Sequence, residues 1–393
     1  MFFFGIKGIK IPTLYSKYTG YSAKLLLDDG TYFNGIGFGF PRTVTGEIVF
    51  NTGMVGYTET MTDPSYKGQI LCFTYPSIGN YGVPSESDLD EYGLPKYFES
   101  DSIQTSGIII NNLSTVSSHW TCVKTLDEWL YQQKVPGIYG IDTRELTKKI
   151  RIEGVMNGKL IINDDHNNFV VKDEDFDDYN SHNFMNEVSV TKDTFYGKSS
   201  DPLIALIDTG TKFSIIRNLV KMGFSVVRIP WNSKYEQVMS YNPKGVVISN
   251  GPGDPIVCKD TIQTVSRIIE KSLPTMGICL GHQILALAAG AKTQKLKFGH
   301  RGQNKTCIDL YSHHSFITSQ NHGYGVELDS LDNTEFELWF QNIDDKTVEG
   351  IKHRSKPIIA VQFHPEASPG PFDCLFVFSK FKDLVINNGN KIN

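Results

Sequence analysis

Pro274-Thr-Met-Gly-Ile-Cys-Leu-Gly-His-Gln-Ile-Leu-Ala-Leu-Ala-Ala-Gly290 is the stretch around which the rest of the chain can be placed. The apolar run up to Ile278 predicts a short buried strand, and the residues after Leu280 have the apolar spacing of a helix closed by Gly290. Cys279 therefore falls at a strand-to-helix turn that has no loop residues to spare. The pattern Gly-x-Cys-x-Gly at such a turn is typical of a nucleophile elbow, where the helix N-terminus favours thiolate over thiol. A buried core cysteine is the alternative interpretation.

The chain from about residue 203 onward alternates strands and helices. Expected strands cover residues 203–207, 225–229, 245–249 and 358–363, and expected helices cover 214–222 and 261–272. This order predicts an α/β fold whose C-terminal domain, residues 203–388, is a doubly wound, mostly parallel sheet of the flavodoxin-like kind. Ligands bind such sheets beyond the carboxyl ends of the strands, so the loops there are expected to meet at the Cys279 elbow.

Residues 23–160 carry strand signals and predict a separate, mixed β/α domain that is rich in strands. A hairpin is expected at 24–33, further strands at 46–50, 69–75 and 106–110, and helices at 126–133 and 143–150. Gly35, Gly37 and Gly39 lack the spacing of a dinucleotide-binding loop, so a turn is expected there. Residues 1–22 are expected to form a frayed N-terminal extension.

Residues 161–202 are interpreted as an acidic connecting segment. Between Asn163 and Tyr179 the chain carries seven acids and one lysine without a regular ligand spacing, which favours a solvated linker over a metal site. Gly197-Lys-Ser199 resembles the end of a phosphate-binding loop, but Lys192 stands where the first glycine is required. We therefore expect no nucleoside triphosphate site, no metal and no cofactor in this chain.

The overall composition is that of a globular protein with a substantial core. The 393 residues include 40% hydrophobic and 21% charged residues, with a net charge of −5, which disfavours a general nucleic-acid binder. No apolar run approaches the roughly 18 residues needed to span a membrane, so no membrane association is expected. The six cysteines are scattered without a Cys-x-x-Cys pair, which favours a reducing compartment.

A cysteine nucleophile needs a base, and the base needs a group that orients it. His364 is the best candidate because it follows a buried strand whose carboxyl end faces the predicted crevice. Glu366, two residues later, could orient the imidazole. His282 lies one helical turn beyond the nucleophile but on a helix that leads away, and His313 and His314 are expected at the surface. A strand-end histidine can also be purely structural, so the residue pattern alone leaves both roles open.

Two further segments offer polar backbone groups to a ligand. Asn250-Gly-Pro-Gly-Asp254 follows the central strand, and its glycines expose N–H groups. An oxyanion-binding loop with the Gly251 and Leu280 amides as donors is favoured over a plain turn. Gln320-Asn-His-Gly-Tyr324 follows the expected strand at 315–318 and could contact a polar substrate.

These motifs resemble a known family. Three resemble the class I, triad-type glutamine amidotransferase domain: Gly251-Pro-Gly-Asp254, Gly277-Ile-Cys-Leu-Gly-His-Gln283 and His364-Pro-Glu366. Others are similar to the small chain of carbamoyl-phosphate synthase: Phe50-Asn-Thr-Gly-Met-Val-Gly-Tyr57, Thr62-Asp-Pro-Ser-Tyr66, Thr74-Tyr-Pro-Ser-Ile-Gly-Asn80, Gly140-Ile-Asp-Thr-Arg144, Lys297-Phe-Gly-His-Arg-Gly302 and His364-Pro-Glu-Ala-Ser-Pro-Gly-Pro371. The resemblance covers about residues 23–385.

The resemblance implies that glutamine is hydrolysed through a γ-glutamyl thioester. The implied roles are nucleophile for Cys279, base for His364 and orienting acid for Glu366. The implied glutamine contacts are Gly251, Gly253, Leu280, Gln283, Asn321, Gly323 and Tyr324, together with Gly53 from the first domain. Many relatives have serine at the position assigned to Gly53, which would remove a side-chain hydrogen bond here. Many also have phenylalanine in place of Tyr324.

The resemblance also implies a partner. A large chain would bind ATP and Mg²⁺ and would use the ammonia with bicarbonate to make carbamoyl phosphate for arginine and pyrimidine biosynthesis, in a heterodimer or a higher oligomer of heterodimers. A stand-alone γ-glutamyl cysteine hydrolase and an inactive regulatory module are the alternatives. Residues 136–144 are similar to the plastid and photosynthetic-bacterial branch. The expected compartment is therefore the plastid stroma, with a plastid-encoded chain, and the cytoplasm is the alternative.

Overall fold

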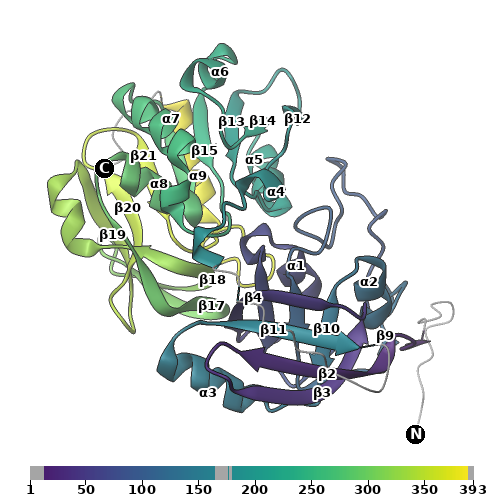
Figure 1. The fold of residues 1–393 in the computed structure, drawn as a ribbon. Helices are drawn as coiled ribbons and strands as arrows, with labels where there is room; N and C mark the ends of the chain where they lie inside the picture. The colour runs from purple at the N-terminus through teal and green to yellow at the C-terminus, as the bar shows by residue number, and fades with distance from the viewer. Residues whose placement is uncertain (1–12, 164–175, 177–178, 388–393) are drawn as a thin grey trace, which may run out of the picture.

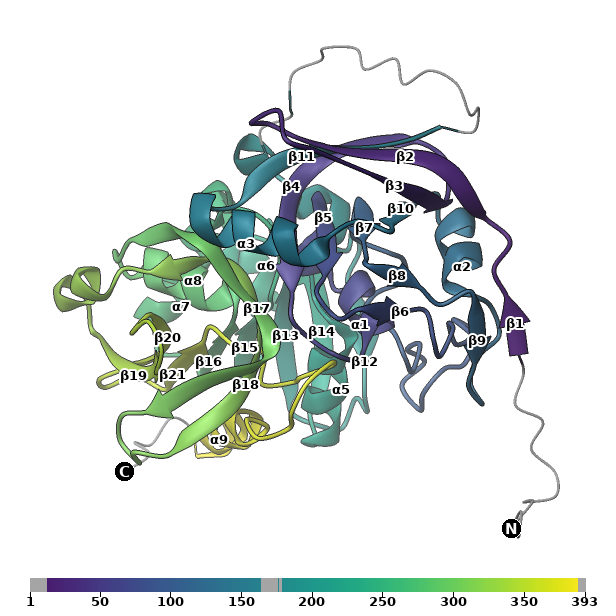
Figure 2. The same ribbon diagram turned by 90° about the horizontal axis from the view of Figure 1, so that it is seen from below.

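A computed structural model describes residues 13–163, 176 and 179–387 of the chain. Within these residues a closed barrel forms the N-terminal domain and an open ten-stranded sheet forms the C-terminal domain (Figure 1). The two domains lie against each other, and strands β17 and β18 of the second domain reach the barrel beside β4 (Figure 1, Figure 2). A site at the end of the open sheet therefore lies beside the interface between the two domains.

Seven strands close the barrel in the order β10-β3-β2-β11-β4-β5-β7. Their bounds are β2 (Thr19–Leu27), β3 (Tyr32–Gly39), β4 (Thr43–Asn51), β5 (Gln69–Phe73), β7 (Gly107–Ile109), β10 (Pro136–Tyr139) and β11 (Met156–Asn163). The short elements beside it are β1 (Thr13–Tyr15), β6 (Ser77–Ile78), β8 (Asn112–Leu113), β9 (Val116–Ser118), α1 (Tyr57–Thr62) and the 3-10 helix η1 (Pro64–Tyr66). The strands and the hairpin expected in this region are confirmed.

Successive side chains of the buried strand β5 belong to two different apolar clusters. Leu71 packs in the cluster that contains Trp129 of α2 (Leu126–Gln132). Ile70 packs in the cluster that contains Leu146 of α3 (Thr143–Glu153). Both expected helices are confirmed, and they stabilise the barrel by covering apolar surface that the strands alone leave open.

Two expectations for the first domain are wrong. Gly35 and Gly37 lie inside strand β3 rather than in a turn. Neighbouring strands leave no room for a side chain at either position: a Cβ atom would lie 2.6 Å from the carbonyl oxygen of Tyr139 at Gly35 and 2.6 Å from the side chain of Ile162 at Gly37. The expected frayed extension is also partly ordered, since β1 pairs with β9 and Thr19–Leu27 includes barrel residues before residue 23. Residues 1–12 of that extension lie outside the described residues.

The open sheet of the second domain has the order β12-β14-β13-β15-β16-β21-β20-β19-β17-β18. Its strands are β12 (Thr194–Tyr196), β13 (Leu203–Asp208), β14 (Ser225–Pro230), β15 (Gly245–Ile248), β16 (Thr275–Ile278), β17 (Thr293–Asp309), β18 (Ser315–Val326), β19 (Phe336–Asn342), β20 (Val348–His353) and β21 (Ile358–Val361). The pairs from β14 to β21 are parallel, which confirms the expected parallel core. The other five strands pair antiparallel, so the sheet is mixed rather than mostly parallel.

Helices cover both faces of the parallel core. Ile204 and Leu206 of β13 pack in one cluster with residues of α5 (Phe213–Lys221) and α9 (Phe376–Ile386). Ala205 and Ile207 pack on the other face with residues of α6 (Tyr235–Ser240), α7 (Lys259–Glu270) and α8 (Leu280–Ala288). This alternation is what burial of a central strand on both faces requires, and it confirms the doubly wound architecture.

The acidic connecting segment is more structured than expected where it is described. Strand β12 pairs antiparallel with β14. Met185 of α4 (Met185–Val188) is fully buried in the core of the second domain. The part of the segment from 179 to 202 therefore packs with the second domain, and most of the acidic run before it lies outside the described residues. None of the helices described is long and apolar enough to cross a membrane.

Candidate active site

The predicted elbow is present. Strand β16 ends at Ile278, helix α8 begins at Leu280, and Cys279 between them has φ 54° and ψ −103°. The flanking glycines are required sterically, because a Cβ atom on Gly277 would lie 2.6 Å from the carbonyl oxygen of Gly281. A Cβ atom on Gly281 would lie 2.2 Å from the carbonyl oxygen of Ile248. The close turn holds the sulfur at the N-terminus of α8, whose positive dipole end stabilises negative charge there.

The imidazole of His364 is placed to act on this thiol. Its Nδ1 lies 2.6 Å from Oε1 of Glu366, and both side chains are buried. Burial lowers the pKa of His364, but the charges of Glu366 and Cys279 outweigh burial and raise it to about 10. Among the described residues, Nε2 of His364 has no hydrogen-bond partner. The ring is therefore held by one nitrogen, and the other is available for proton transfer.

A buried lysine stands behind the Glu366 carboxylate. Nζ of Lys212 lies 3.0 Å from Oε1 of Glu366, and it also donates to the backbone carbonyl of Ala367. Burial would raise the pKa of Glu366, but Lys212 and His364 lower it to about 2. Glu366 is therefore kept ionised, and the positive charge of His364 is stabilised. The sequence reasoning missed Lys212, which lies far from the other residues in the chain and just after β13.

His282 is not part of this proton-transfer geometry. Its Nδ1 lies 3.1 Å from Oε1 of Gln362, and burial lowers its pKa to about 4. The neighbouring Gln283 donates to the same Gln362 oxygen at 3.0 Å and to the carbonyl of Tyr324 at 2.8 Å. These contacts confirm the expectation that His282 is a structural histidine. His313 and His314 are exposed, as expected.

A cavity opens over the thiol between the two domains. Six of the residues that the resemblance implied as glutamine contacts line it together with Cys279: Gly251, Gly253, Gln283, Asn321, Gly323 and Tyr324. Asn321 and its neighbours lie inside strand β18 rather than after it, because the strand is longer than expected. Leu280 is buried directly after the nucleophile, at the first position of α8. A Cβ atom on Gly251 would lie 1.9 Å from the carbonyl oxygen of Thr209, so only glycine fits there.

The structure does not bring Gly53 to this cavity. Gly53 is buried beside Gln303, and its N–H donates to Oδ1 of Asn51 at 2.6 Å. Ser65 of η1 lines the cavity instead, and its hydroxyl accepts a 2.9 Å hydrogen bond from Nδ2 of Asn250. The role of Gly53 as a glutamine contact therefore stays a prediction, and Ser65 is a second candidate for the contact from the first domain. The sequence held a signal for Ser65. The Asp63 side chain accepts a hydrogen bond from the Ser65 N–H, and Asp-Pro followed by a polar residue is typical of such a capped helical turn.

Several other lining residues were not predicted from the sequence. They are Glu47, Gln69, Val155, Tyr179, Lys295, Leu296, Arg301 and His322. Nζ of Lys295 lies 2.7 Å from Oε1 of Glu47, which joins the second domain to the barrel at the edge of the cavity. Both signs of charge are therefore present around one small polar cavity, as recognition of a zwitterionic amino acid requires.

Two family models match the chain. One, described as "Carbamoyl-phosphate synthase small chain, CPSase domain", matches residues 25–160, and the other, "Glutamine amidotransferase class-I", matches residues 205–384. The small chain of carbamoyl phosphate synthase from Pyrococcus furiosus is 49% identical over 92% of this chain and 97% of its own length. The arginine-specific small chain from Chaetomium globosum is 45% identical over 97% of this chain and 83% of its own length.

A third relative is a longer protein whose name specifies ammonia. "Carbamoyl-phosphate synthase [ammonia], mitochondrial" from Homo sapiens is 45% identical over 93% of this chain, which corresponds to 24% of that protein. The two domain matches occur here in one chain and in the same order as the barrel and the open sheet. This chain therefore belongs to the carbamoyl-phosphate synthase small chain family, as a glutamine-hydrolysing subunit with a class I amidotransferase domain.

Proposed function

We propose that Cys279 carries out the glutamine hydrolysis and that His364 and Glu366 complete its triad. The observation that carries the proposal is the 2.6 Å contact between Nδ1 of His364 and Glu366 beside the elbow cysteine. A nucleophile, a base within reach and an acid that orients the base are the three parts this chemistry needs.

The proposed reaction starts with attack of the Cys279 sulfur on the side-chain amide carbon of glutamine. The C–N bond then breaks, and protonated His364 gives its proton to the departing nitrogen, so that ammonia leaves and a γ-glutamyl thioester remains. His364, now neutral, takes a proton from water as the water attacks the thioester. Glutamate leaves, and the thiolate and the imidazolium are restored.

The backbone N–H groups of Gly251 and Leu280 are the proposed oxyanion donors. Both belong to segments held beside the sulfur, Leu280 as the first residue of α8 and Gly251 in the loop after β15. Gly253, Gln283, Asn321, Gly323 and Tyr324 are the proposed glutamine contacts in the second domain, and Ser65 is the proposed contact in the first.

The proposed acceptor of the ammonia is the large chain of carbamoyl-phosphate synthase. ATP and Mg²⁺ would bind that chain and not this one. One relative is named for ammonia rather than glutamine. The assembled thiol and imidazole support glutamine, because a protein that uses free ammonia has no need of a cysteine nucleophile.

The test uses this chain assembled with the large chain and compares Cys279→Ala with a control, Cys258→Ala. Cys258 is also fully buried in the second domain, but it does not line the cavity. We expect Cys279→Ala to abolish carbamoyl phosphate synthesis from glutamine and to leave synthesis from added ammonium intact, whereas Cys258→Ala keeps both. Undiminished glutamine-dependent synthesis by Cys279→Ala would refute the assignment.

A second measurement separates the two alternative functions. An electrophilic glutamine analogue should add one covalent label at Cys279, which an inactive regulatory module would not accept. A stand-alone hydrolase would turn over glutamine at its full rate without the large chain. We expect labelling at Cys279 and a glutaminase rate that rises when the large chain is added.

A further inference from the structure

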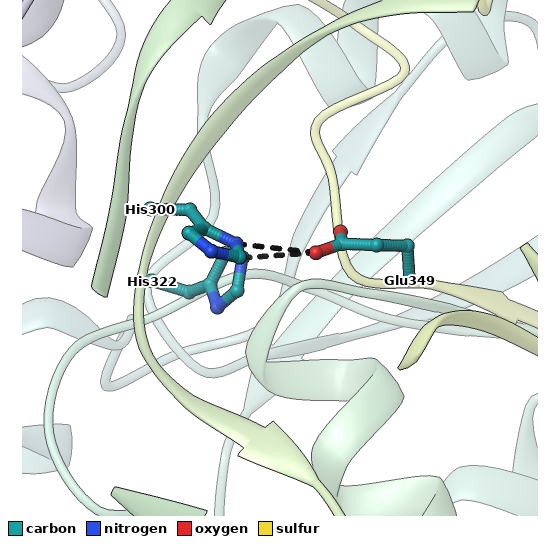
Figure 3. Close-up of side chains that lie close together, drawn as sticks. All are labelled: His300, His322 and Glu349. Carbon is teal, nitrogen blue, oxygen red and sulfur yellow. Dashed lines mark hydrogen bonds and ion pairs between the residues drawn. The ribbon is translucent and has the colours of Figure 1, made fainter. Parts of the chain in front are cut away.

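Three buried side chains that the proposed mechanism does not use converge at one point. His300 comes from β17, His322 from β18 and Glu349 from β20, and Figure 3 shows their side chains pointing toward one another. One nitrogen or oxygen of each lies within 4.8 Å of the other two. Oε1 of Glu349 lies 3.2 Å from Nδ1 of His300 and 3.8 Å from Nε2 of His322.

The outward-facing atoms of both imidazoles are already engaged. Nε2 of His300 lies 2.7 Å from Oδ2 of Asp345. Nδ1 of His322 lies 2.8 Å from the backbone carbonyl of Tyr324, to which it donates its proton. A histidine that binds a metal almost always donates its other N–H to a carboxylate or a backbone carbonyl, because this fixes the tautomer and the direction of the ring. Each ring here makes one of these two contacts, so each inner nitrogen carries the free lone pair when the rings are neutral.

The carboxylate is oriented in the same way. Oε2 of Glu349 accepts a 3.0 Å hydrogen bond from Nε2 of Gln320. Its inner oxygen, Oε1, accepts a hydrogen bond from Thr347 at 3.1 Å, and without an ion it is also hydrogen-bonded to Nδ1 of His300 at 3.2 Å. Nε2 of His322 has one other polar neighbour, Oε1 of Gln320, at a long 3.4 Å. An ion that replaces the proton shared by His300 and Glu349 would therefore find a lone pair on each of the three inner donor atoms.

The distances fit a small tetrahedral ion. Bonds of about 2.0–2.1 Å to nitrogen and oxygen place adjacent tetrahedral ligands about 3.3 Å apart. The separations of 3.2 and 3.8 Å from Oε1 of Glu349 bracket this value, and the two imidazole nitrogens, which lie within 4.8 Å of each other, would move together on binding. A divalent cation would also neutralise the two negative charges of Glu349 and Asp345 in a buried place.

We propose that His300, His322 and Glu349 bind a divalent first-row transition metal, with zinc the best match to two imidazoles and one carboxylate. Two nitrogen donors disfavour Mg²⁺ and Ca²⁺, which prefer all-oxygen sites. This proposal departs from the sequence-based expectation that the chain holds no metal. It goes beyond the proposed function, because the ion would touch neither the thiol nor glutamine.

The ion's role would be structural. In the sheet, β20 is separated from β18 by β19 and β17, so the three ligands join strands that are not all neighbours. His322 also lines the active-site cavity, between Asn321 and Gly323. A metal bound to its Nε2 would hold that wall of the cavity in place and would lower the number of conformations open to the β17–β18 hairpin.

Zinc and Co²⁺ titrations of the full chain, stripped of metal by a chelator, test the proposal. We expect one ion per chain, and an absorption spectrum of tetrahedral Co²⁺ in the visible range. Glu349→Gln and His300→Gln should weaken zinc binding by at least 100-fold, and Asp345→Asn by about 10–100-fold because it removes only the partner of a ligand. His353→Gln is the matched control, since His353 is a buried histidine on the same strand as Glu349 but outside the cluster.

Two outcomes would overturn the proposal. Wild-type protein that binds zinc no more tightly than Glu349→Gln would show that the three residues form only an ion-pair network. Equal losses of binding in His353→Gln and Glu349→Gln would show that zinc binds elsewhere. Asp345→Asn tests the site even where the ligand variants fail to fold. The Asp345 side chain is 46% exposed, and asparagine has the same size, so this variant should keep the fold.

Discussion

Nδ2 of Asn321 donates a 3.0 Å hydrogen bond to Oδ2 of Asp63, and so joins the strand beside the nucleophile to the first domain. The backbone carbonyl of the same Asn321 accepts the Cys279 thiol at 3.6 Å. The other Asp63 oxygen caps η1 through the N–H of Ser65 at 2.9 Å. One buried carboxylate of the barrel domain therefore positions groups on both sides of the cavity. The first domain is thus a component of the candidate active site.

Replacement of Asp63 by asparagine tests this coupling. The amide keeps the size of the side chain, but its NH₂ group faces either the donor on Asn321 or the donors on Ser65 and Asn250, so at least one of the three hydrogen bonds is lost. A small displacement of catalytic groups can cost on the order of 100-fold in rate, so we expect kcat/KM for glutamine to fall by about 10–100-fold. Synthesis from ammonium in the assembled enzyme should not change. The control is Asp88→Asn at an exposed ion pair, and equal effects of the two variants would contradict the coupling.

The choice between Gly53 and Ser65 as the glutamine contact of the first domain gives a second prediction. Ser65→Ala removes a hydroxyl that lines the cavity, so the KM for glutamine should rise by about 10-fold, the equivalent of one hydrogen bond of roughly 1.4 kcal/mol. Gly53→Ser should not lower KM, because Gly53 lies outside the cavity and its Cβ position is 2.4 Å from Gln303. Steady-state kinetics of both variants decide between the positions. A lower KM for Gly53→Ser together with an unchanged KM for Ser65→Ala would show that the first-domain contact with glutamine is at position 53 and not at Ser65.

The parts of the site that are local in sequence could be predicted, and those that depend on distant pairing could not. The Cys279 elbow follows from glycine spacing and apolar periodicity within a few residues, and the two-residue spacing of His364 and Glu366 is equally local. Lys212 reaches Glu366 from another strand end, and no periodicity signals that contact. The position of Ser65 depends on how the barrel packs against the sheet.

The mixed character of the sheet was missed for a related reason. In strand β17 (Thr293–Asp309) only Leu296 and Phe298 alternate with polar residues, and residues 299–305 are glycine or polar, so most of the strand gives no strand signal. Its structure is fixed by pairing with β18 and by bulges near Lys295 and Gly302. Tertiary contacts override local preference there. The cluster of His300, His322 and Glu349 was missed for the same reason, because it exists only once β17, β18 and β20 are assembled.

The charge of His364 predicts how activity depends on pH. Its pKa is raised to about 10 by Glu366 and Cys279, so the imidazolium that protonates the departing nitrogen should persist until the pH approaches about 10. Glu366→Gln removes a negative charge next to the cation, which lowers its pKa by about 1–3 units. The basic limb of the pH profile of kcat/KM should therefore move to lower pH by a similar amount. An unchanged limb in Glu366→Gln would show that another group controls it.

Lys212 should stabilise the fold through the same ion pair. Removing one partner of a buried pair leaves an uncompensated charge, so Lys212→Met should lower the free energy of unfolding by about 3–5 kcal/mol at neutral pH. Glu366 has a folded-state pKa of about 2, below its ordinary value of 4.5. Its contribution is therefore present above pH 4.5 and is lost as the pH falls from there toward 2.

Denaturant titrations at several pH values measure both effects. In Lys212→Met the folded-state pKa of Glu366 should rise toward its ordinary value of 4.5, so less stability should be lost between pH 4.5 and pH 2 than in wild type. Lys96→Met is the control, because Lys96 pairs with Asp88 at the surface and its loss should leave stability within error. Equal destabilisation by Lys212→Met and Lys96→Met would show that the buried Lys212–Glu366 pair contributes no more to stability than the surface pair does.

The elbow itself makes the sharpest steric prediction. Gly281→Ala would place a methyl group 2.2 Å from the carbonyl oxygen of Ile248, and backbone atoms cannot yield without moving β15 or α8. We expect loss of glutamine-dependent synthesis by at least 100-fold, on the order expected when a nucleophile is displaced by about 1 Å. Gly325→Ala is the matched control, because the nearest atoms to its Cβ position belong to Leu296 at 3.6 Å, an ordinary contact distance. Circular dichroism separates displacement from unfolding: Gly281→Ala should keep its secondary structure while its Cys279 reacts more slowly with an electrophilic glutamine analogue. If both variants reacted at the wild-type rate, the sulfur would be positioned by something other than the tight packing of α8 against β15.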